Sequence, residues 1–213
     1  MIKVNRYSLL FFGFLPGITV SLCFLYPFLA ALIYPCSKVF QLYLVYKFGS
    51  FRIGEFRKHF WWGLFAGLLM SLVPAICIAM GLLGYLDPEP LRIKLQELGV
   101  LDHFFVFVLA LSLLNSALEE LFFRCFLFER QQFFSKKWTY IYHGLIFIPH
   151  HLVALSKYFT IYWNVLFNIV LFVAAVIWCY LRDRGMSFLG LWISHVICDL
   201  VVLYYAGSKL LFP

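Results

Sequence analysis

Long apolar blocks constrain this chain more than any other feature of its sequence. Its 213 residues are 64% hydrophobic and only 13% charged, whereas a soluble domain is about 45–50% apolar and about 25% charged. A helix that crosses the hydrocarbon core of a bilayer needs about 20 mostly apolar residues, and the chain holds roughly seven such stretches with short connections. The sequence therefore predicts an all-α fold, a polytopic transmembrane helical bundle of about seven spans that forms a single integral membrane domain over residues 1–213.

Breaks in the apolar pattern predict where the spans end. The first apolar region is too long for one span, and we expect it to divide near Tyr34-Pro35, with Pro16 and Pro27 as kinks because proline removes a helix hydrogen bond. After the division near residue 35, further spans are expected at about 59–86, 104–128, 139–155, 160–181 and 187–211.

The Asp87-Pro88-Glu89-Pro90 run is a clear helix breaker. Residues 91–103 follow it and alternate charged residues with leucines in a helical rhythm. This pattern predicts one interfacial helix that lies at the membrane surface or acts as a lid.

The net charge of +7 is spread over small basic groups at the ends of the apolar blocks. Such groups suit contact with membrane lipid and do not form the contiguous basic patch of a nucleic-acid-binding protein, so no nucleic-acid partner is expected. Most lysines and arginines fall on the side of the N-terminus, while Lys38, in the expected first loop, falls on the other. The positive-inside rule then predicts a multi-pass protein of the cell (inner) membrane with a cytoplasmic N-terminus and an outside C-terminus.

Two adjacent carboxylates, Glu119 and Glu120, lie inside the apolar stretch 104–128. Each costs at least about 2.5–3.5 kcal/mol to insert into a bilayer. Glu120 and Arg124 are four residues apart and can pair on one helical face, whereas Glu119 points elsewhere and is a candidate general base. The alternative is a helix that ends early and leaves residues 119–130 as an interfacial tail, but phenylalanines and leucines continue the apolar pattern.

Histidines supply the other candidate site residues. His150 and His151 are adjacent, so at most one is expected to face a given direction. His195 and Asp199 are four residues apart on one helical face, where the carboxylate can orient the imidazole or share with it the binding of a water, although a helix-packing hydrogen bond is the simpler alternative. The remaining histidines, near span ends, are expected at the interface; these are His59, His103 and His143.

The candidate site residues are expected at a similar depth in the membrane. Glu119, His151 and His195 each lie at a similar distance along the chain from a basic residue on the same side of the membrane. At a rise of about 1.5 Å per residue, all three lie roughly 16–21 Å from that level. Scattered structural polar residues have no reason to share a level, so this favours one site.

The residues also resemble the motifs of a known family. Glu119-Glu120-x-x-x-Arg124, Phe147-x-x-x-His151 and His195-x-x-x-Asp199 occur in the order and membrane setting of the CPBP family of CAAX-processing and bacteriocin-processing intramembrane proteases, which includes the Ras-converting CAAX endopeptidases. The resemblance covers about residues 104–199, the expected catalytic core. Pro149-His150 stands where small residues are commoner, and Asp199 replaces an asparagine often found there.

The resemblance implies an intramembrane endopeptidase that hydrolyses a peptide bond of a membrane-associated or lipidated protein substrate. It implies that Glu119 activates a water, that Glu120 and Arg124 brace the site, and that His151, His195 and Asp199 stabilise the oxyanion or position the water. No cofactor is required, but a zinc ion stays open, with Glu119, His151 and His195 as its ligands.

Two other functions stay open at this point. One is a non-proteolytic protein on the same scaffold, acting in lipoprotein or acyl modification or as an immunity or assembly partner. The other is a proton-coupled transporter, since intramembrane Glu and His also build proton relays. The lack of inverted repeats in the sequence counts against the transporter.

Overall fold

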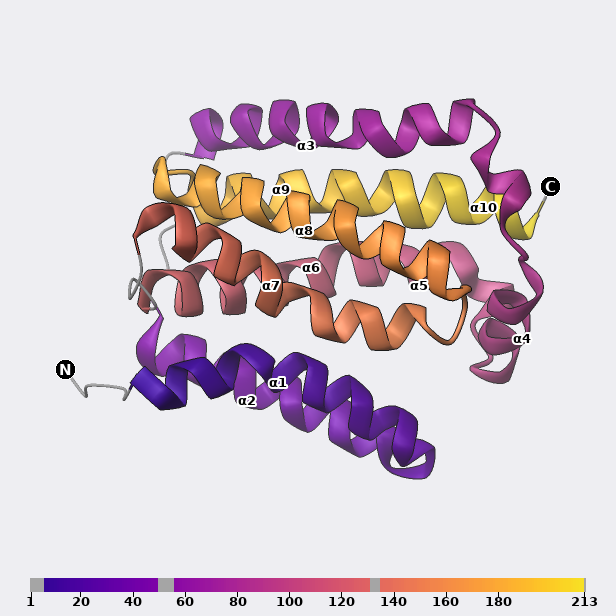
Figure 1. Cartoon of the computed structure of the whole chain (residues 1–213), viewed down its shortest axis with the longest axis horizontal. Helices are drawn as coiled ribbons and strands as arrows, with labels where there is room; N and C mark the ends of the chain where they lie inside the picture. Colours follow the sequence, from indigo (N-terminus) through magenta and orange to yellow (C-terminus); the bar gives the residue numbers. More distant parts are fainter. Residues whose placement is uncertain (1–5, 50–55, 131–134, 213) are drawn as a thin grey trace. The chain divides into compact units, whose positions relative to one another are not determined.

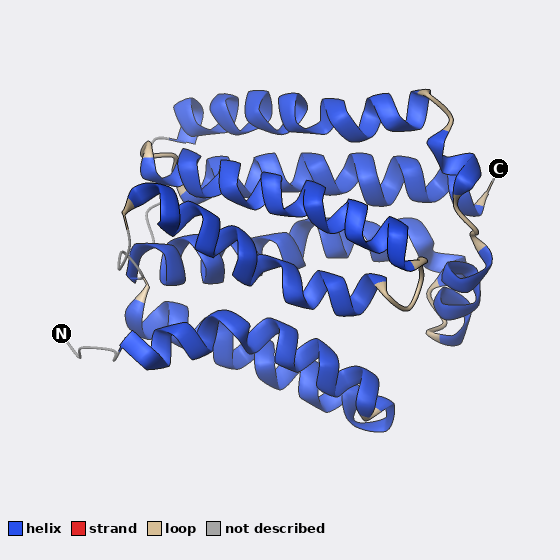
Figure 2. Ribbon diagram, in the orientation of Figure 1, coloured by secondary structure: helices blue, strands red, loops and turns tan. Residues whose placement is uncertain are grey.

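The computed structural model describes residues 6–49, 56–130 and 135–212, and no strand occurs among them (Figure 2). The all-α prediction is confirmed. The longer helices are α1 (Arg6–Leu25), α2 (Ala30–Phe48), α3 (Phe56–Ala79), α7 (Lys136–Leu155) and α8 (Ile161–Asp183) (Figure 1). The helical run 104–128 comprises α5 (Phe104–Ala110), η4 (Leu111–Asn115), α6 (Ser116–Glu119) and η5 (Glu120–Phe128). The last run comprises α9 (Phe188–Asp199), η6 (Leu200–Ala206) and α10 (Gly207–Leu211).

Within the described ranges, five helical stretches are long and apolar enough to cross a membrane. They are Ser8–Leu25, His59–Ala79, Leu101–Phe128, Ile161–Asp183 and Phe188–Leu211. Helices α2 and α7, of 19 and 20 residues, occupy the other two predicted span positions. Both carry more polar residues, and they are not among the five.

The first turn lies earlier than predicted. The chain leaves α1 at Tyr26 and passes through a short 3-10 turn, η1 (Pro27–Leu29), before α2 begins, and Pro35 lies inside α2. The predicted division near Tyr34-Pro35 is therefore wrong. A proline disfavours helical geometry in the residue before it, so Pro27 can end α1. Pro35 lies inside α2, where it removes one backbone hydrogen bond without ending the helix.

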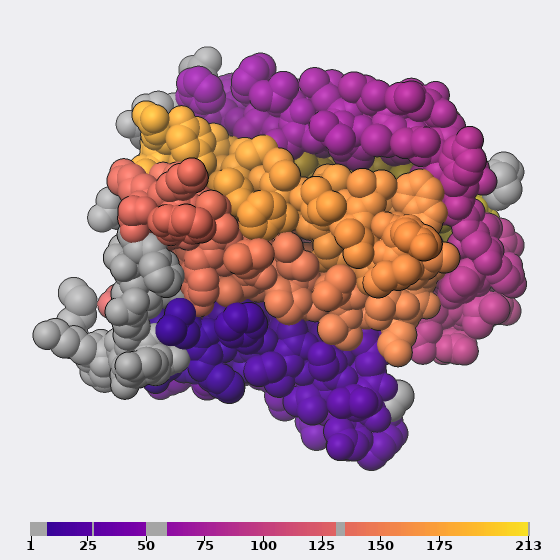
Figure 3. Space-filling model, viewed as in Figure 1, coloured from indigo at the N-terminus to yellow at the C-terminus, as the bar shows by residue number. Residues whose placement is uncertain are grey.

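Residues 1–52 and 118–188 form one compact unit, and residues 53–117 and 189–213 form another. In the first unit α1 lies along α7, and Figure 3 shows the indigo atoms of α1 directly against the orange-red atoms of α7. Two glycines one helical turn apart permit this approach: an added Cβ on Gly13 would lie 3.1 Å from Ile146 Cδ1, and one on Gly17 would lie 2.9 Å from Pro149 Cβ. Small residues at this spacing are typical of close helix packing in membranes.

Helices α7 and α8 form a hairpin in the same unit, held by polar contacts towards each end. Asn164 Nδ2 donates to the carbonyl oxygen of Leu152 at 3.0 Å. Near the other end, the Lys136 ammonium and the Tyr140 hydroxyl contact the Asp183 carboxylate at 2.8 and 2.7 Å. These contacts set the register in which α7 presents its histidines.

In the second unit α3 packs very closely on α9. A Cβ on Gly63 would lie 2.8 Å from the Cα of Gly190, and a Cβ on Gly67 would lie 2.9 Å from the Cα of Ser194. Trp192 Nε1 donates to the carbonyl oxygen of Leu113 at 2.9 Å and fixes α9 to η4. Glycine at these positions lets two backbones approach where any side chain would separate them.

A helix is present near the predicted range 91–103, as α4 (Glu89–Glu97). It starts within the proline-rich breaker, because proline is tolerated in the first turn of a helix, where its missing N–H would have no partner. Leu95 is buried against Phe104, Val108 and Leu211. The short helix is thus packed within the second unit through one apolar face. Lys94 and Glu97 form an exposed pair 2.9 Å apart.

Candidate active site

The run 104–128 changes its hydrogen-bonding pattern where the two glutamates lie. The α-helical turn α6 ends at Glu119, and η5 continues from Glu120 with the wider π-type turn. Such turns are rare and often occur at functional sites. Glu119 is 3% exposed and Glu120 0%, and the helix continues through Phe128, which excludes the alternative of an interfacial tail starting at residue 119.

Glu120 and Arg124 form the pair that their spacing predicts. Arg124 Nη1 lies 3.3 Å from Glu120 Oε1, and Arg124 is 1% exposed. The guanidinium carbon lies 4.6 Å from the ring centroid of Phe147 and 5.1 Å from that of Trp178. Aromatic faces attract a cation, so three helices hold this side chain in place.

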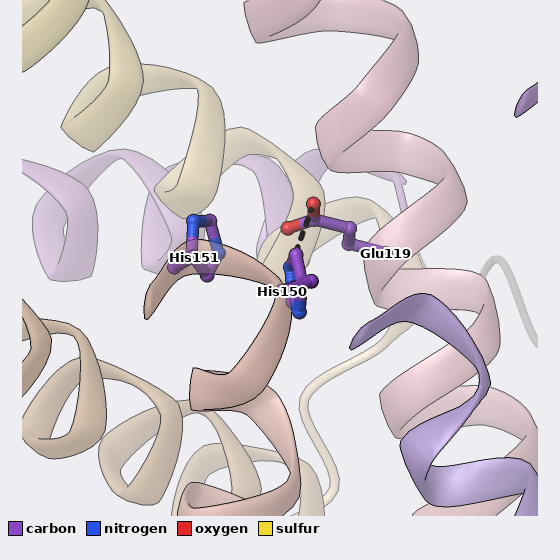
Figure 4. A group of neighbouring side chains, drawn as sticks. All are labelled: Glu119, His150 and His151. Atoms are coloured by element: carbon purple, nitrogen blue, oxygen red, sulfur yellow. Dashed lines mark ion pairs between the residues drawn. The ribbon is translucent and has the colours of Figure 1, made fainter. Parts of the chain in front are cut away.

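Helix α7 brings both of its adjacent histidines to Glu119 (Figure 4). His150 Nε2 lies 3.4 Å from Glu119 Oε1, and the rings of His150 and His151 are 4.0 Å apart. Nitrogen atoms of both rings and an oxygen of Glu119 lie within 4.8 Å of one another. The expectation that only one of the two histidines can face the site is wrong, because two imidazoles can reach one carboxylate from neighbouring positions.

Aromatic rings fix the orientation of these histidines. The His150 ring stacks on Phe123 with an interplanar angle of 14° and a centroid distance of 5.7 Å. Phe147 meets His150 edge to face at 5.2 Å and lies 4.9 Å from His151. The Phe-x-x-x-His spacing therefore has a direct role, since Phe147 contacts both imidazoles and the guanidinium of Arg124.

His195 and Asp199 lie on α9 in the second unit. His195 Nε2 is 3.7 Å from Asp199 Oδ1, and His195 is buried. Asp199 is the last residue of α9, and the π-type turn η6 begins at the next residue. The predicted pairing of these two side chains on one helical face is thus present within that unit.

Comparison with known protein families gives a match over part of the chain. The model of a family described as type II CAAX prenyl endopeptidase Rce1-like matches residues 101–201. The match covers a little under half of the chain, and this segment is similar to that family. No curated protein and no solved structure matches the chain.

The match to the CAAX endopeptidase family model confirms the resemblance seen in the motifs. The matched segment contains all six predicted site residues, which are Glu119, Glu120, Arg124, His151, His195 and Asp199. The described ranges hold five helical stretches able to cross a bilayer, and together with the match to a prenyl endopeptidase family they show an integral membrane protein. The individual roles of the six residues stay predictions.

The side chains around Glu119 also fit a metal ion. Glu119, His150 and His151 offer one carboxylate and two imidazoles, ligand types that zinc takes in proteins. This set includes His150, whereas the sequence suggested Glu119, His151 and His195.

Sequence reasoning missed other residues of the first unit. Lys38 lies inside α2, not in a loop, and the charge of Glu119 acts on both Lys38 and Tyr34. The first turn was predicted at the wrong position, and this placed the lysine in a loop. The sequence feature that could have identified it is a cation inside an apolar stretch. His143, expected at the interface, is 3% exposed and lies 5.2 Å from the Phe128 ring; the prediction for this histidine is wrong because α8 and η5 cover α7 there.

Proposed function

We propose that this protein is an intramembrane endopeptidase that cleaves a peptide bond of a membrane-associated or lipidated protein, with Glu119 as the general base. The observation that carries the proposal is the buried Glu119 carboxylate 3.4 Å from His150 Nε2. A carboxylate among imidazoles inside a membrane helix is costly to maintain and marks a functional site. The match to a family of prenyl endopeptidases supplies the reaction class.

The chemistry needs one water and one carboxylate. Glu119 takes a proton from the water while the water oxygen bonds to the peptide carbonyl carbon. The carbonyl π electrons move onto the carbonyl oxygen and form an oxyanion. When that oxyanion collapses, the carbon–nitrogen bond breaks and the leaving amine takes the proton from Glu119. A positioned base typically contributes about 10²–10⁴-fold to such a step.

The other predicted residues act around this carboxylate. By family resemblance, the residues that position the water or stabilise the oxyanion are His151, His195 and Asp199. The buried Glu120–Arg124 pair braces the helix that bears Glu119. His150, which the family pattern does not include, holds the Glu119 carboxylate from the opposite helix.

A zinc ion would be held by Glu119, His150 and His151. When bound, such an ion polarises a carbonyl and generates a hydroxide nucleophile at neutral pH. Metal content of the purified protein, measured beside its activity, tests whether this donor set is loaded.

The test of the proposal is cleavage of a quenched fluorescent peptide with a prenylated cysteine, by the full chain in proteoliposomes. Glu119→Gln should lower kcat by about 10³-fold or more, since the amide cannot accept the proton of water. Glu97→Gln, on exposed α4, is the matched control and should keep the wild-type rate. Cleavage by Glu119→Gln at the wild-type rate would contradict the proposal, and His151→Ala and His195→Ala are expected to lower kcat in the same assay.

We also propose that the protein lies in the cell (inner) membrane with its N-terminus in the cytoplasm. The turn at residues 26–29 carries no lysine or arginine, and Lys38 belongs to α2. Both facts strengthen the bias of basic residues toward the N-terminal side on which this orientation rests.

A further inference from the structure

Lys38 lies in the middle of α2, in the part of the chain outside the family match. The match begins at residue 101, whereas α2 spans Ala30–Phe48. Helix α2 packs against η5 within the first unit. Glu120 is the first residue of η5, and Glu119 directly precedes it. The N-terminal hairpin of α1 and α2 thus stands beside the candidate active site.

Two other polar side chains of α2, Ser37 and Gln41, are already engaged. Ser37 Oγ lies 2.6 Å from Thr19 Oγ1, and Gln41 Nε2 donates to Ser37 Oγ at 3.2 Å. These bonds tie α2 to α1. They account for the polar residues that face α1, but not for Lys38.

The Lys38 ammonium has no such explanation. It lies 5.2 Å from the ring centroid of Tyr34, one helical turn earlier. Across the described ranges it makes no ion pair or hydrogen bond with another side chain. The Glu119 carboxylate is close enough for its negative charge to act on this ammonium. A cation in an apolar helix that leaves its N–H donors unused is costly, and such residues often mark a functional site.

The chemistry at Glu119 creates a charge that this cation can meet. Attack of water on a peptide bond places a full negative charge on the former carbonyl oxygen, close to the carboxylate that removed the proton. Donors aimed at a developing charge in a low-dielectric site stabilise the transition state far more than the ground state. The ammonium of lysine is a compact point charge on a flexible stem that can reach such an oxygen.

We propose that Lys38 is a further catalytic residue, whose ammonium donates to the scissile carbonyl oxygen and stabilises the oxyanion formed at Glu119. This inference rests on the proposed function. It makes the α1–α2 hairpin a part of the active site, although the family match does not include it.

The test separates binding of the substrate from binding of the transition state. Cleavage of the prenylated fluorescent peptide gives kcat, the same peptide on the Glu119→Gln background gives ground-state affinity, and a peptide phosphonate mimics the tetrahedral oxyanion. Lys38→Met should lower kcat by about 10²–10³-fold and weaken the phosphonate by a comparable factor, while ground-state affinity changes less than about threefold. Lys38→Arg keeps the charge and should recover part of kcat, and Lys47→Met, an exposed lysine of the same helix, should match the wild type.

The outcomes distinguish the two proposals. No cleavage by the wild type contradicts the proposed function itself. Cleavage by the wild type and by Lys38→Met at equal rates overturns only the role of Lys38, as does an equal loss of ground-state and phosphonate affinity. If Lys38→Met does not survive purification, Lys38→Gln takes its place, and the same split between the two affinities is required.

Discussion

The Glu120–Arg124 pair differs from the exposed pair Lys94–Glu97 in one respect that decides its energetics. Both pairs lie on single helices, but the side chains of the first are 0% and 1% exposed and those of the second 38% and 58%. A buried charge that loses its partner cannot be solvated, whereas an exposed one returns to water.

We therefore predict that Glu120→Gln lowers the free energy of unfolding by about 3–5 kcal/mol, because it leaves the buried Arg124 cation without its counter-charge. Glu97→Gln should lower it by less than about 1 kcal/mol. Unfolding in detergent, followed by tryptophan fluorescence and denaturant titration, measures both. Similar losses for the two variants would show that the buried pair does not stabilise the fold.

His150 shows how residue-scale reasoning from sequence falls short. Its neighbour His151 fits the family spacing, and the sequence favours one inward histidine over the other. The structure brings both rings to Glu119, because Phe123 and Phe147 from different helices hold the His150 ring in place. Spacing along one helix carries no information about rings supplied by another helix.

At the scale of elements, close helix packing depends on a few glycines. Gly63 on α3 faces Gly190 on α9, and an added Cβ would lie 2.8 Å from the Gly190 Cα. Backbone atoms cannot move aside as the end of a flexible side chain can. The helices must separate to accept any side chain at this position.

Gly63→Ala should accordingly lower the free energy of unfolding by about 1–3 kcal/mol. Gly84→Ala is its control, because a Cβ there meets nothing within 4 Å. Thermal unfolding of both variants in the same detergent compares them. An unchanged midpoint for Gly63→Ala would contradict the packing of α3 on α9.

The elements themselves were largely predictable, because long apolar runs and breakers act locally. Most elements lie close to where the sequence places them. They are the run 104–128, the helix at the Asp87–Pro90 breaker and the last three long helices. The first turn was not predictable, since three prolines lie in one apolar region and a proline ends a helix or not according to its position within it.

At the scale of the whole molecule, the proposed orientation puts the two termini on opposite sides of the membrane. An epitope tag at the C-terminus should be accessible in intact cells, and a tag at the N-terminus only after permeabilisation, because the basic residues that favour the cytoplasm lie on the N-terminal side. Antibody labelling of sealed and permeabilised cells measures this. Equal accessibility of both tags would contradict an odd number of spans.

The amino-acid sequence was enough to predict a helical chain embedded in a membrane, with carboxylates and histidines that resemble the motifs of a protease family. Those conclusions depend on composition, run length and motif spacing, which are local properties of the chain. The packing of the helices brings His150 and His151 together with Glu119, surrounds Arg124 with three aromatic rings, and sets α2, which contains Lys38, against η5. These facts depend on how helices far apart in the chain pack, and no spacing within a single helix encodes that packing.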